Sequence, residues 1–263
     1  MKRGLILGLF VFLIVLSFSL ASAAVPFGVS DIDHIKNETA PEDPALSVPA
    51  IAGNVSEINL EGFTTTQSWQ GYFGNVTGTI QLADASDNVM YNWSLTSPQG
   101  EVYASTNNSI TWQYIQCFNF TADGTKADDT AQAGETSLHG TNLTQLEDEF
   151  NIKYDDVDGV NETFSFFGSS EGHDLFYTAS REFSQGQCRS TRIFNNNASQ
   201  ENGQFEEVLL YEPTTSSVVF TSILDEDLLG FDNRTHDFQM LVLEDGHRTD
   251  TETTPYYFWV ELE

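Results

Sequence analysis

The sequence predicts an all-β protein: an antiparallel β-sandwich-like domain with long loops, at most one short helix and an N-terminal signal helix. Three observations support this prediction. Apolar and polar residues alternate with a period of two in many short runs, turn-forming residues recur about every ten positions, and helical spacing of apolar residues is nearly absent. Short strands joined by such turns are typical of sandwiches and related antiparallel folds.

The clearest strand signal lies between Ser68 and Ser105, where two consecutive hairpins are expected. In Val76–Leu82 and in Val89–Leu95, apolar residues alternate with polar ones, as they do in strands that bury one face. We therefore expect the rest of the fold to be built on these hairpins, with Trp93 in the core.

Other segments follow the same alternation. Strands are expected at Ser56–Leu60, Gln67–Phe73, Phe164–Phe167, Phe176–Phe183, Arg189–Phe194, Phe205–Tyr211, Ser217–Leu224, Asp237–Leu243 and Tyr256–Leu262. Leu143, Leu146 and Phe150 stand at helical spacing with acidic residues between them, so the one short helix is expected here. The polar stretch 121–141 indicates a long surface loop.

The first residues have the features of a secretory signal peptide. The basic pair Lys2-Arg3 precedes an apolar run from Leu5 to Leu20, and Ala21-Ser22-Ala23 follows as a cleavage motif. Cleavage is expected before Ala24. Two alternatives remain open: an uncleaved N-terminal anchor, and a prepilin-type cut that leaves the apolar helix on the mature chain.

These boundaries give three parts: a signal peptide (1–23), a linker rich in proline and acids (24–50) and one β-sandwich-like domain (51–263). Four of the seven prolines lie in the linker, which has no periodic apolar pattern and is expected to be extended. No second linker-like composition divides the domain.

The chain is strongly acidic, with 39 Asp and Glu against 10 Lys and Arg and a net charge of −29. Loss of Lys2 and Arg3 with the signal peptide would change this charge to −31. Nucleic acid is excluded as a partner, because phosphate binding requires basic side chains that release counterions. The acid excess is explained by solubility in a salty exterior, or by binding of divalent cations.

Acceptor motifs for N-glycosylation, Asn-x-Ser/Thr, are in excess. They begin at Asn37, Asn54, Asn75, Asn92, Asn107, Asn119, Asn142, Asn161, Asn197 and Asn233. Some of these motifs are explained by the frequency of Asn, Ser and Thr in turns. The number as a whole predicts an exported, heavily N-glycosylated surface.

Cys117 and Cys188 are the only cysteines. Two cysteines in an exported chain predict one disulfide bond, with two buried thiols as the alternative. A structural zinc site is not expected, because two cysteines fall short of the four ligands it needs.

No catalytic motif stands in a convincing context, so we expect no enzymatic activity. Gly168–Gly172 matches G-x-S-x-G, but this nucleophile motif requires a strand before it, a helix after it and a parallel sheet. The five histidines are scattered, without metal-binding spacing such as HExxH. A surface turn explains the serine motif.

One acidic turn is a candidate calcium site, formed by Asp155, Asp156, Asp158 and Asn161. The EF-hand pattern fails there, so calcium, the one cofactor considered, would need a looser loop of carboxylates and carbonyls. Asp225, Glu226, Asp227 and Asp232 make a second such cluster. The alternative at either place is an acidic turn with nothing bound.

Aromatic residues make up 13% of the chain. Exposed rings stack on sugars, whereas buried rings form a sandwich core. Trp69 and Tyr72, in a segment flanked by glycine, are the candidate ligand contacts. Trp259 lies in an alternating strand and is expected in the core.

Residues 56–263 include the segments WQGYFGNVTGTIQLADASDNVMYNWSL, SPQGEVYAS, YDDVDGVNETF, FEEVLLYE, GFDNRTHDFQMLVLEDG and YYFWVELE. These segments resemble a set of uncharacterised exported proteins encoded in archaeal genomes, and the resemblance covers most of residues 56–263. The resemblance implies an archaeal cell-surface location and a β-rich fold, and it carries no catalytic residues.

We therefore expect a secreted, N-glycosylated archaeal cell-surface protein with a structural or interaction role in adhesion or in the envelope. Its expected partners are cell-envelope components, other surface proteins or carbohydrate, and it would meet the membrane only through an uncleaved N-terminal segment. A carbohydrate-binding module or glycosidase-like β domain is one alternative function. A pilin-like filament subunit is another.

Overall fold

The structure of the protein is a computed structural model, and it describes residues 25–95, 99–120, 141–153, 155–168, 171–193, 204–246 and 253–262. The predicted signal helix, nearly all of the predicted loop 121–141 and the acceptor Asn197 lie outside these residues. Within them the fold is mostly β with antiparallel pairing, as the sequence predicts. No helix in the described part of the chain is long and apolar enough to cross a bilayer.

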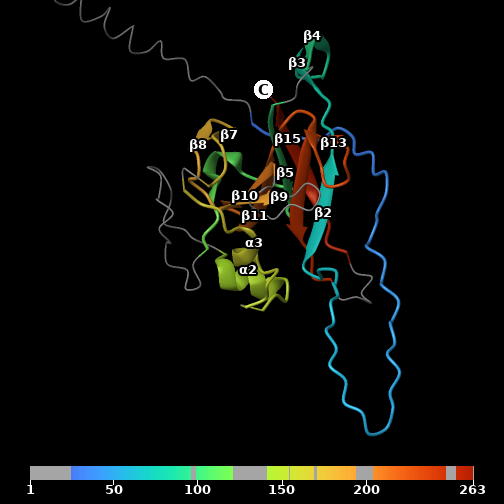
Figure 1. The fold of residues 1–263 in the computed structure, drawn as a ribbon. Helices are drawn as coiled ribbons and strands as arrows, with labels where there is room; N and C mark the ends of the chain where they lie inside the picture. Colours follow the sequence, from blue (N-terminus) through green and yellow to red (C-terminus); the bar gives the residue numbers. More distant parts are fainter. Residues whose placement is uncertain are drawn as a thin grey trace, which may run out of the picture.

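A seven-stranded antiparallel sheet forms the centre of the molecule (Figure 1). Its order is β1-β15-β5-β11-β10-β6, and β9 also pairs with β10. The strands are β1 (Phe27–Gly28), β5 (Gly100–Ser105), β6 (Gln116–Cys117), β9 (Ser190–Ile193), β10 (Phe205–Glu212), β11 (Ser217–Ile223) and β15 (Tyr257–Leu262). The expected pairing of the segments around Pro213 is confirmed as β10 with β11.

The central strand β10 is buried on both faces. Leu209 faces one hydrophobic cluster and Leu210 faces the other, because successive side chains of a strand point to opposite faces. Their partners on β11, Phe220 and Val219, divide in the same way. A strand buried on both faces accounts for the nearly continuous apolar run of this segment.

A second, two-stranded sheet covers one face of the central sheet. It pairs β2 (Trp69–Gly74) with β14 (Phe238–Leu243), and Met240 and Val242 of β14 pack with Leu209 in the first cluster. Helices α2 (Leu143–Glu149) and α3 (Val160–Thr163) close the end of this layer through Leu146 and Val160. The two packed sheets make the fold sandwich-like.

The expected helix is confirmed as α2, and its start follows from a capping box. The Asn142 side chain accepts a bond from Gln145 N, and the Gln145 side chain accepts one from Asn142 N. Two of the backbone donors at the helix start are satisfied in this way. The four-residue α3 was not expected and occupies the region just before Phe164.

The other face of the central sheet is covered by smaller elements. A 3₁₀ turn (Trp112–Tyr114) and the hairpin of β7 (Phe176–Thr178) and β8 (Arg181–Phe183) pack on it with Trp112, Phe176 and Phe183. Trp259 is buried in this second cluster, as expected.

The predicted disulfide bond between Cys117 and Cys188 is confirmed. It joins β6 to the segment just before β9, across 71 positions of sequence. In the chain-entropy model a loop of this length contributes about 4 kcal/mol.

Hairpin β3 (Thr79–Ala83) and β4 (Val89–Ser94) forms at the expected place, but no face of it is buried. The expectation that the fold is built on this hairpin is wrong, and so is the core position of Trp93, which is 50% exposed. The pair forms a sheet of its own and projects from the body (Figure 1). A period of two shows which face is apolar but not whether another element covers it.

Several other expectations need correction. The second expected hairpin does not form, because β5 pairs with β11 and β15, and Phe176–Phe183 is divided into β7 and β8. Ser56–Leu60 forms no strand, and its residues are extended and exposed. Phe164–Phe167 is not a strand either, because it makes only an isolated bridge between Phe166 and Ser190. Within the expected linker, Phe27 and Gly28 pair with β15 as β1. A further short pair, β12 (Leu228–Leu229) with β13 (Thr235–His236), closes a turn next to β14.

Candidate interaction surface

Hairpin β3–β4 presents one apolar face and one polar face. Ile80 lies opposite Trp93, and Leu82 lies opposite Tyr91, so four large apolar side chains share one face. The Tyr91 and Trp93 rings contact each other with centroids 4.8 Å apart. All four side chains are exposed, and so is Met90 at 83%.

The polar face carries Thr79 and Gln81 on β3 and Asn92 on β4. The Gln81 amide donates to the Thr79 hydroxyl at 3.1 Å. Asn92 is also an exposed acceptor for N-glycosylation, so sugar attached there would cover the polar face and leave the apolar face open.

Neither strand of the hairpin contains a charged residue, although the chain has 39 acids. Natural edge strands are usually protected from pairing by charge, proline or a covering element. Both strands here are edges, and a lone two-stranded hairpin is only marginally stable in water. These features make the hairpin the candidate interaction surface of the described residues.

The base of the hairpin is attached firmly to the body. The backbone N–H of Val76 donates to Asp237 Oδ2 at 2.8 Å, and Asp237 N–H donates to Gly74 O at 2.9 Å. Gly78 lies so close to Leu262 of β15 that a β-carbon at this position would clash. The body therefore holds the hairpin in one direction.

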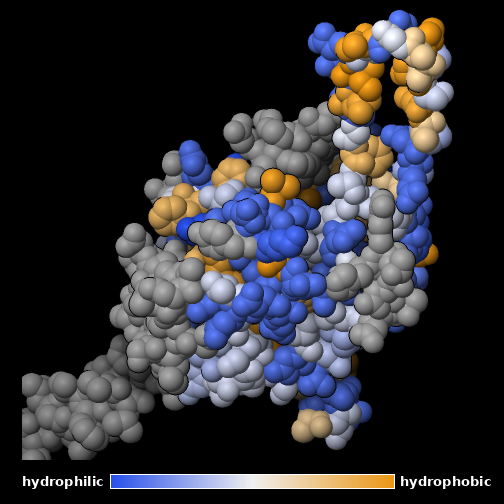
Figure 2. All heavy atoms as spheres, turned by 90° about the horizontal axis from the view of Figure 1, so that it is seen from below, coloured by the Kyte–Doolittle hydropathy of each residue, from blue (hydrophilic) through white to orange (hydrophobic). Residues whose placement is uncertain are grey.

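Most of the remaining surface seen in Figure 2 is hydrophilic, as the acidic composition requires. In the same view, hydrophobic residues gather on a part of the chain that projects from the body. The exposed apolar side chains of the hairpin contrast with the acidic composition of the chain.

The predicted ligand aromatics, Trp69 and Tyr72, pack against the first cluster. Trp69 donates its indole N–H to Asp158 O at 2.6 Å and lies 6.1 Å from the Phe164 ring. Tyr72 makes an edge contact with Phe258 at 5.3 Å. Among the described residues, Tyr91 and Trp93 form an exposed aromatic pair, and the absence of charge in β3 and β4 is the sequence signal that could have found it.

The residues of the first calcium candidate use their oxygens for bonds within the protein. Asp156 Oδ2 accepts from Lys153 N, Asp158 Oδ2 accepts from the Thr66 hydroxyl at 2.6 Å, and Asn161 Oδ1 accepts from Arg189 at 3.0 Å. Asp155 lies in the same turn. Among the described residues, no group of three or more acidic, His or Cys side chains is placed to hold a metal ion.

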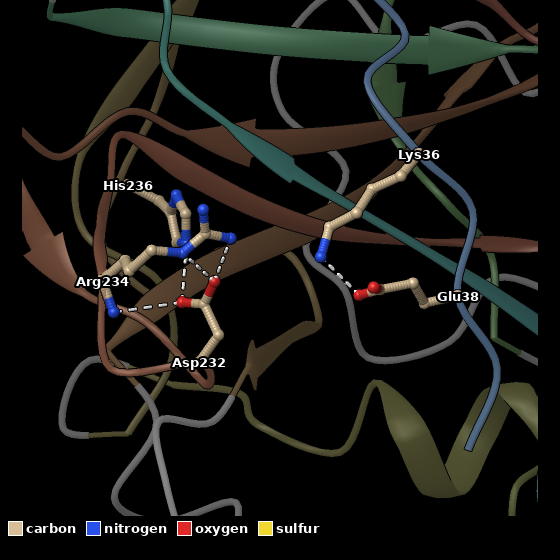
Figure 3. A network of polar contacts seen from close by, with 5 residues as sticks. All are labelled: Lys36, Glu38, Asp232, Arg234 and His236. Carbon is tan, nitrogen blue, oxygen red and sulfur yellow. Dashed lines mark hydrogen bonds and ion pairs between the residues drawn. The ribbon is translucent and has the colours of Figure 1, made fainter. Parts of the chain in front are cut away.

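In the second acidic cluster, Asp232 lies between two basic side chains (Figure 3). Its carboxylate accepts from Arg234 Nε at 2.6 Å and lies 2.9 Å from His236 Nε2. Desolvation alone would raise the pKa of Asp232, but these hydrogen bonds outweigh it and lower the pKa to about 2. Figure 3 also shows the separate pair of Lys36 with Glu38 in the extended N-terminal segment.

The predicted glycosylation acceptors fall into three groups. Five are exposed: Asn37, Asn54, Asn75, Asn92 and Asn233. Three are half-buried with side chains in hydrogen bonds: Asn107, Asn142 and Asn161. Asn119 is buried. In the folded protein, the five exposed acceptors are therefore the ones most accessible to glycosylation.

Buried acids form a feature that sequence reasoning missed. Glu101 and Glu261 lie opposite each other on β5 and β15, and the Tyr103 hydroxyl reaches both, at 3.4 and 3.0 Å. Their carboxylates accept the backbone N–H groups of Tyr177 and Ala179. Burial raises the pKa of Tyr103 well above its ordinary value, and the two carboxylates raise it further. This arrangement fastens the β7–β8 hairpin to the central sheet.

Glu207 of β10 is fully buried on the opposite face. Burial raises the pKa of Glu207 well above its ordinary value, although its carboxyl accepts from Leu241 N–H at 2.8 Å. It thus connects the central sheet to β14, and its burial favours the neutral form of the carboxyl group.

His173 is also structural. Its Nε2 accepts from Cys188 N–H at 3.0 Å, and its Nδ1 lies 2.6 Å from Asp174 O. These contacts fit a neutral ring, and burial lowers the pKa of His173.

Comparison with family models, with curated proteins and with solved structures found no match to this chain.

Proposed function

We propose that this protein is an exported archaeal cell-surface glycoprotein whose role is to bind other envelope proteins through the β3–β4 hairpin. The observation that carries the proposal is the uncharged, apolar and exposed character of both hairpin strands. The signal-like N-terminus, the disulfide bond and the five exposed glycosylation acceptors support an extracellular location.

The chemistry of the hairpin favours a protein partner. The hairpin has no Lys or Arg with which to bind an anionic lipid surface, and its turn carries Asp84 and Asp87. The rings of Tyr91 and Trp93 are inclined at 56° and do not form one flat stacking platform for a sugar. An apolar strand face with open edges fits another β-rich protein better.

The test is fractionation of the native host. Wild type is expected with the envelope, and a variant with Ile80→Ser and Trp93→Ser is expected in the medium. The matched control is Leu175→Ser, which removes an exposed apolar side chain from the body and should leave the distribution unchanged. Equal retention of the hairpin variant and wild type would refute the role of the hairpin.

The glycoprotein part of the proposal has its own test. The intact mass of the native protein is expected to exceed that of the bare chain, with sugar located at exposed acceptors such as Asn92 and Asn233. A mass equal to that of the unmodified mature chain would refute the proposal that the protein is glycosylated.

A further inference from the structure

A second unsatisfied β element lies in the extended segment before β2. Ser56–Leu60 has the sequence pattern of a strand, yet its backbone makes no hydrogen bond to another segment of the described chain. Ile58 and Leu60 are both exposed, Leu60 at 87%. Their spacing of two puts both side chains on one face of an extended strand.

The hairpin offers a matching open edge along β3. Leu95 N–H donates to Gly78 O, so these two residues form a hydrogen-bonded pair. Hydrogen-bonded and non-hydrogen-bonded pairs alternate along antiparallel strands. Thr79 and Gln81 therefore lie in non-hydrogen-bonded pairs and direct their backbone groups away from β4. Along this edge Ile80 and Leu82 also lie on one face with a spacing of two. The edge of β4 is less suitable, because sugar on Asn92 would crowd it.

These two elements lie at opposite ends of the molecule. In Figure 1 the β3–β4 hairpin projects at the top, while the extended segment turns near Gly53 at the bottom. Within one chain the structure places them apart and unpaired. In an assembly of identical copies, Ser56–Leu60 of one molecule can meet the β3 edge of another, and every such contact can have the same geometry.

We propose that Ser56–Leu60 of one copy adds as a third strand to the β3 edge of the next copy. Ile58 and Leu60 then extend the apolar face of Ile80 and Leu82, and the main chain pairs along the open edge. This inference rests on the proposed function of the hairpin and names its partner.

Such a contact is heterologous, because donor and acceptor are different surfaces. Each copy keeps one free donor and one free acceptor after it has bound, so the contact extends into a chain of copies unless the geometry closes a ring. The envelope partner of the hairpin is therefore another molecule of the same protein.

Two variants separate donor from acceptor. The donor variant carries Ile58→Asp and Leu60→Asp, which place charge on the added strand. The acceptor variant carries Gln81→Pro, which removes an outward N–H and the side-chain bond from Gln81 to Thr79 but no backbone hydrogen bond between β3 and β4. A second acceptor variant, Thr79→Glu with Gln81→Glu, sets like charge against Glu57 of the donor strand and covers the case in which proline disturbs the strand.

The measurement is sedimentation velocity of the secreted protein over a range of concentrations. Wild type is expected to form dimers and larger species, and each variant alone is expected to be monomeric. An equal mixture of donor and acceptor variants is expected to form one-to-one dimers and nothing larger, because one intact contact remains per pair. Leu46→Asp with Val48→Asp, on the other arm of the same extended segment, is the control and should assemble like wild type.

The other outcomes overturn the inference in distinct ways. Self-association of the donor variant would mean that hairpins pack on each other. A monomeric wild type at every concentration would mean that the contact between copies does not form. Retention of wild type in the envelope with loss of the Ile80→Ser and Trp93→Ser variant would then still support the proposed function with a different protein as partner.

Discussion

Two pairs of strands in this protein have similar sequences and opposite environments. The β10–β11 pair is buried on both faces between two hydrophobic clusters, whereas β3–β4 is exposed on both faces. Both contain aliphatic and aromatic residues, but β10 also contains acids, of which Glu207 and Glu212 are buried, and β3–β4 contains none. In this chain, therefore, charged residues in a strand do not indicate exposure, and their absence does not indicate burial.

Removal of the disulfide bond should produce the largest difference between the two pairs of strands, because it destabilises the body and leaves the hairpin unchanged. Replacing both cysteines, with Cys117→Ser and Cys188→Ser, is expected to lower the free energy of unfolding by about 4 kcal/mol, because the unfolded chain loses its closed loop. Urea unfolding measures this change. The exchange of hairpin amides should stay as in wild type, and a cost near zero would contradict the role given to the bridge.

A matched pair of leucine substitutions compares the strands directly. Leu209→Ala in β10 is expected to cost about 2–5 kcal/mol, because it opens a cavity in a fully buried cluster. Leu82→Ala in β3 is expected to change stability by less than about 0.5 kcal/mol in the isolated protein, because its side chain is already exposed. If thermal or urea unfolding gave similar losses of stability for the two variants, the Leu82 side chain would have to be buried against another part of the protein.

The buried acid of β10 should produce a smaller effect that depends on pH. The pKa of Glu207 is raised in the folded state, so unfolding releases its proton and stability falls as pH rises above about 4.3, its ordinary pKa, towards the folded value. Glu207→Gln is expected to flatten this part of the stability curve and to raise stability at pH 8 relative to wild type.

A control variant, Glu226→Gln, removes an exposed acid and should keep the wild-type slope. Stability curves from urea unfolding at several pH values provide the measurement. An unchanged slope in Glu207→Gln would mean that the Glu207 carboxyl is ionised in the folded protein.

Much of the fold was predictable because local patterns agreed with their tertiary environment. The pairing of β10 with β11, helix α2 and the Cys117–Cys188 bond follow from alternation, helical spacing and cysteine number. Ser56–Leu60 and Trp93 were misjudged for one reason: strand propensity is satisfied by any partner, and the sequence does not say whether that partner lies in the same chain.

The candidate surface was predictable only in part. Aromatic residues drew attention to Trp69, but burial of that ring depends on Phe164, which is distant in sequence. The acidic turn suggested calcium, but its oxygens accept bonds from Thr66 and Arg189, which no local pattern connects to it. The buried acids on β5 and β15 meet only because the strands pair.

Hydrogen exchange of the hairpin tests most directly whether β3–β4 is the binding element. Peptides that cover residues 76–95 should exchange rapidly in the dilute purified protein and slowly in the native envelope, while peptides from β10 and β11 should be protected in both. The outward amides of Thr79 and Gln81 should gain the most protection. Equal exchange of the hairpin in the purified protein and in the envelope would contradict the proposal that it binds a partner there.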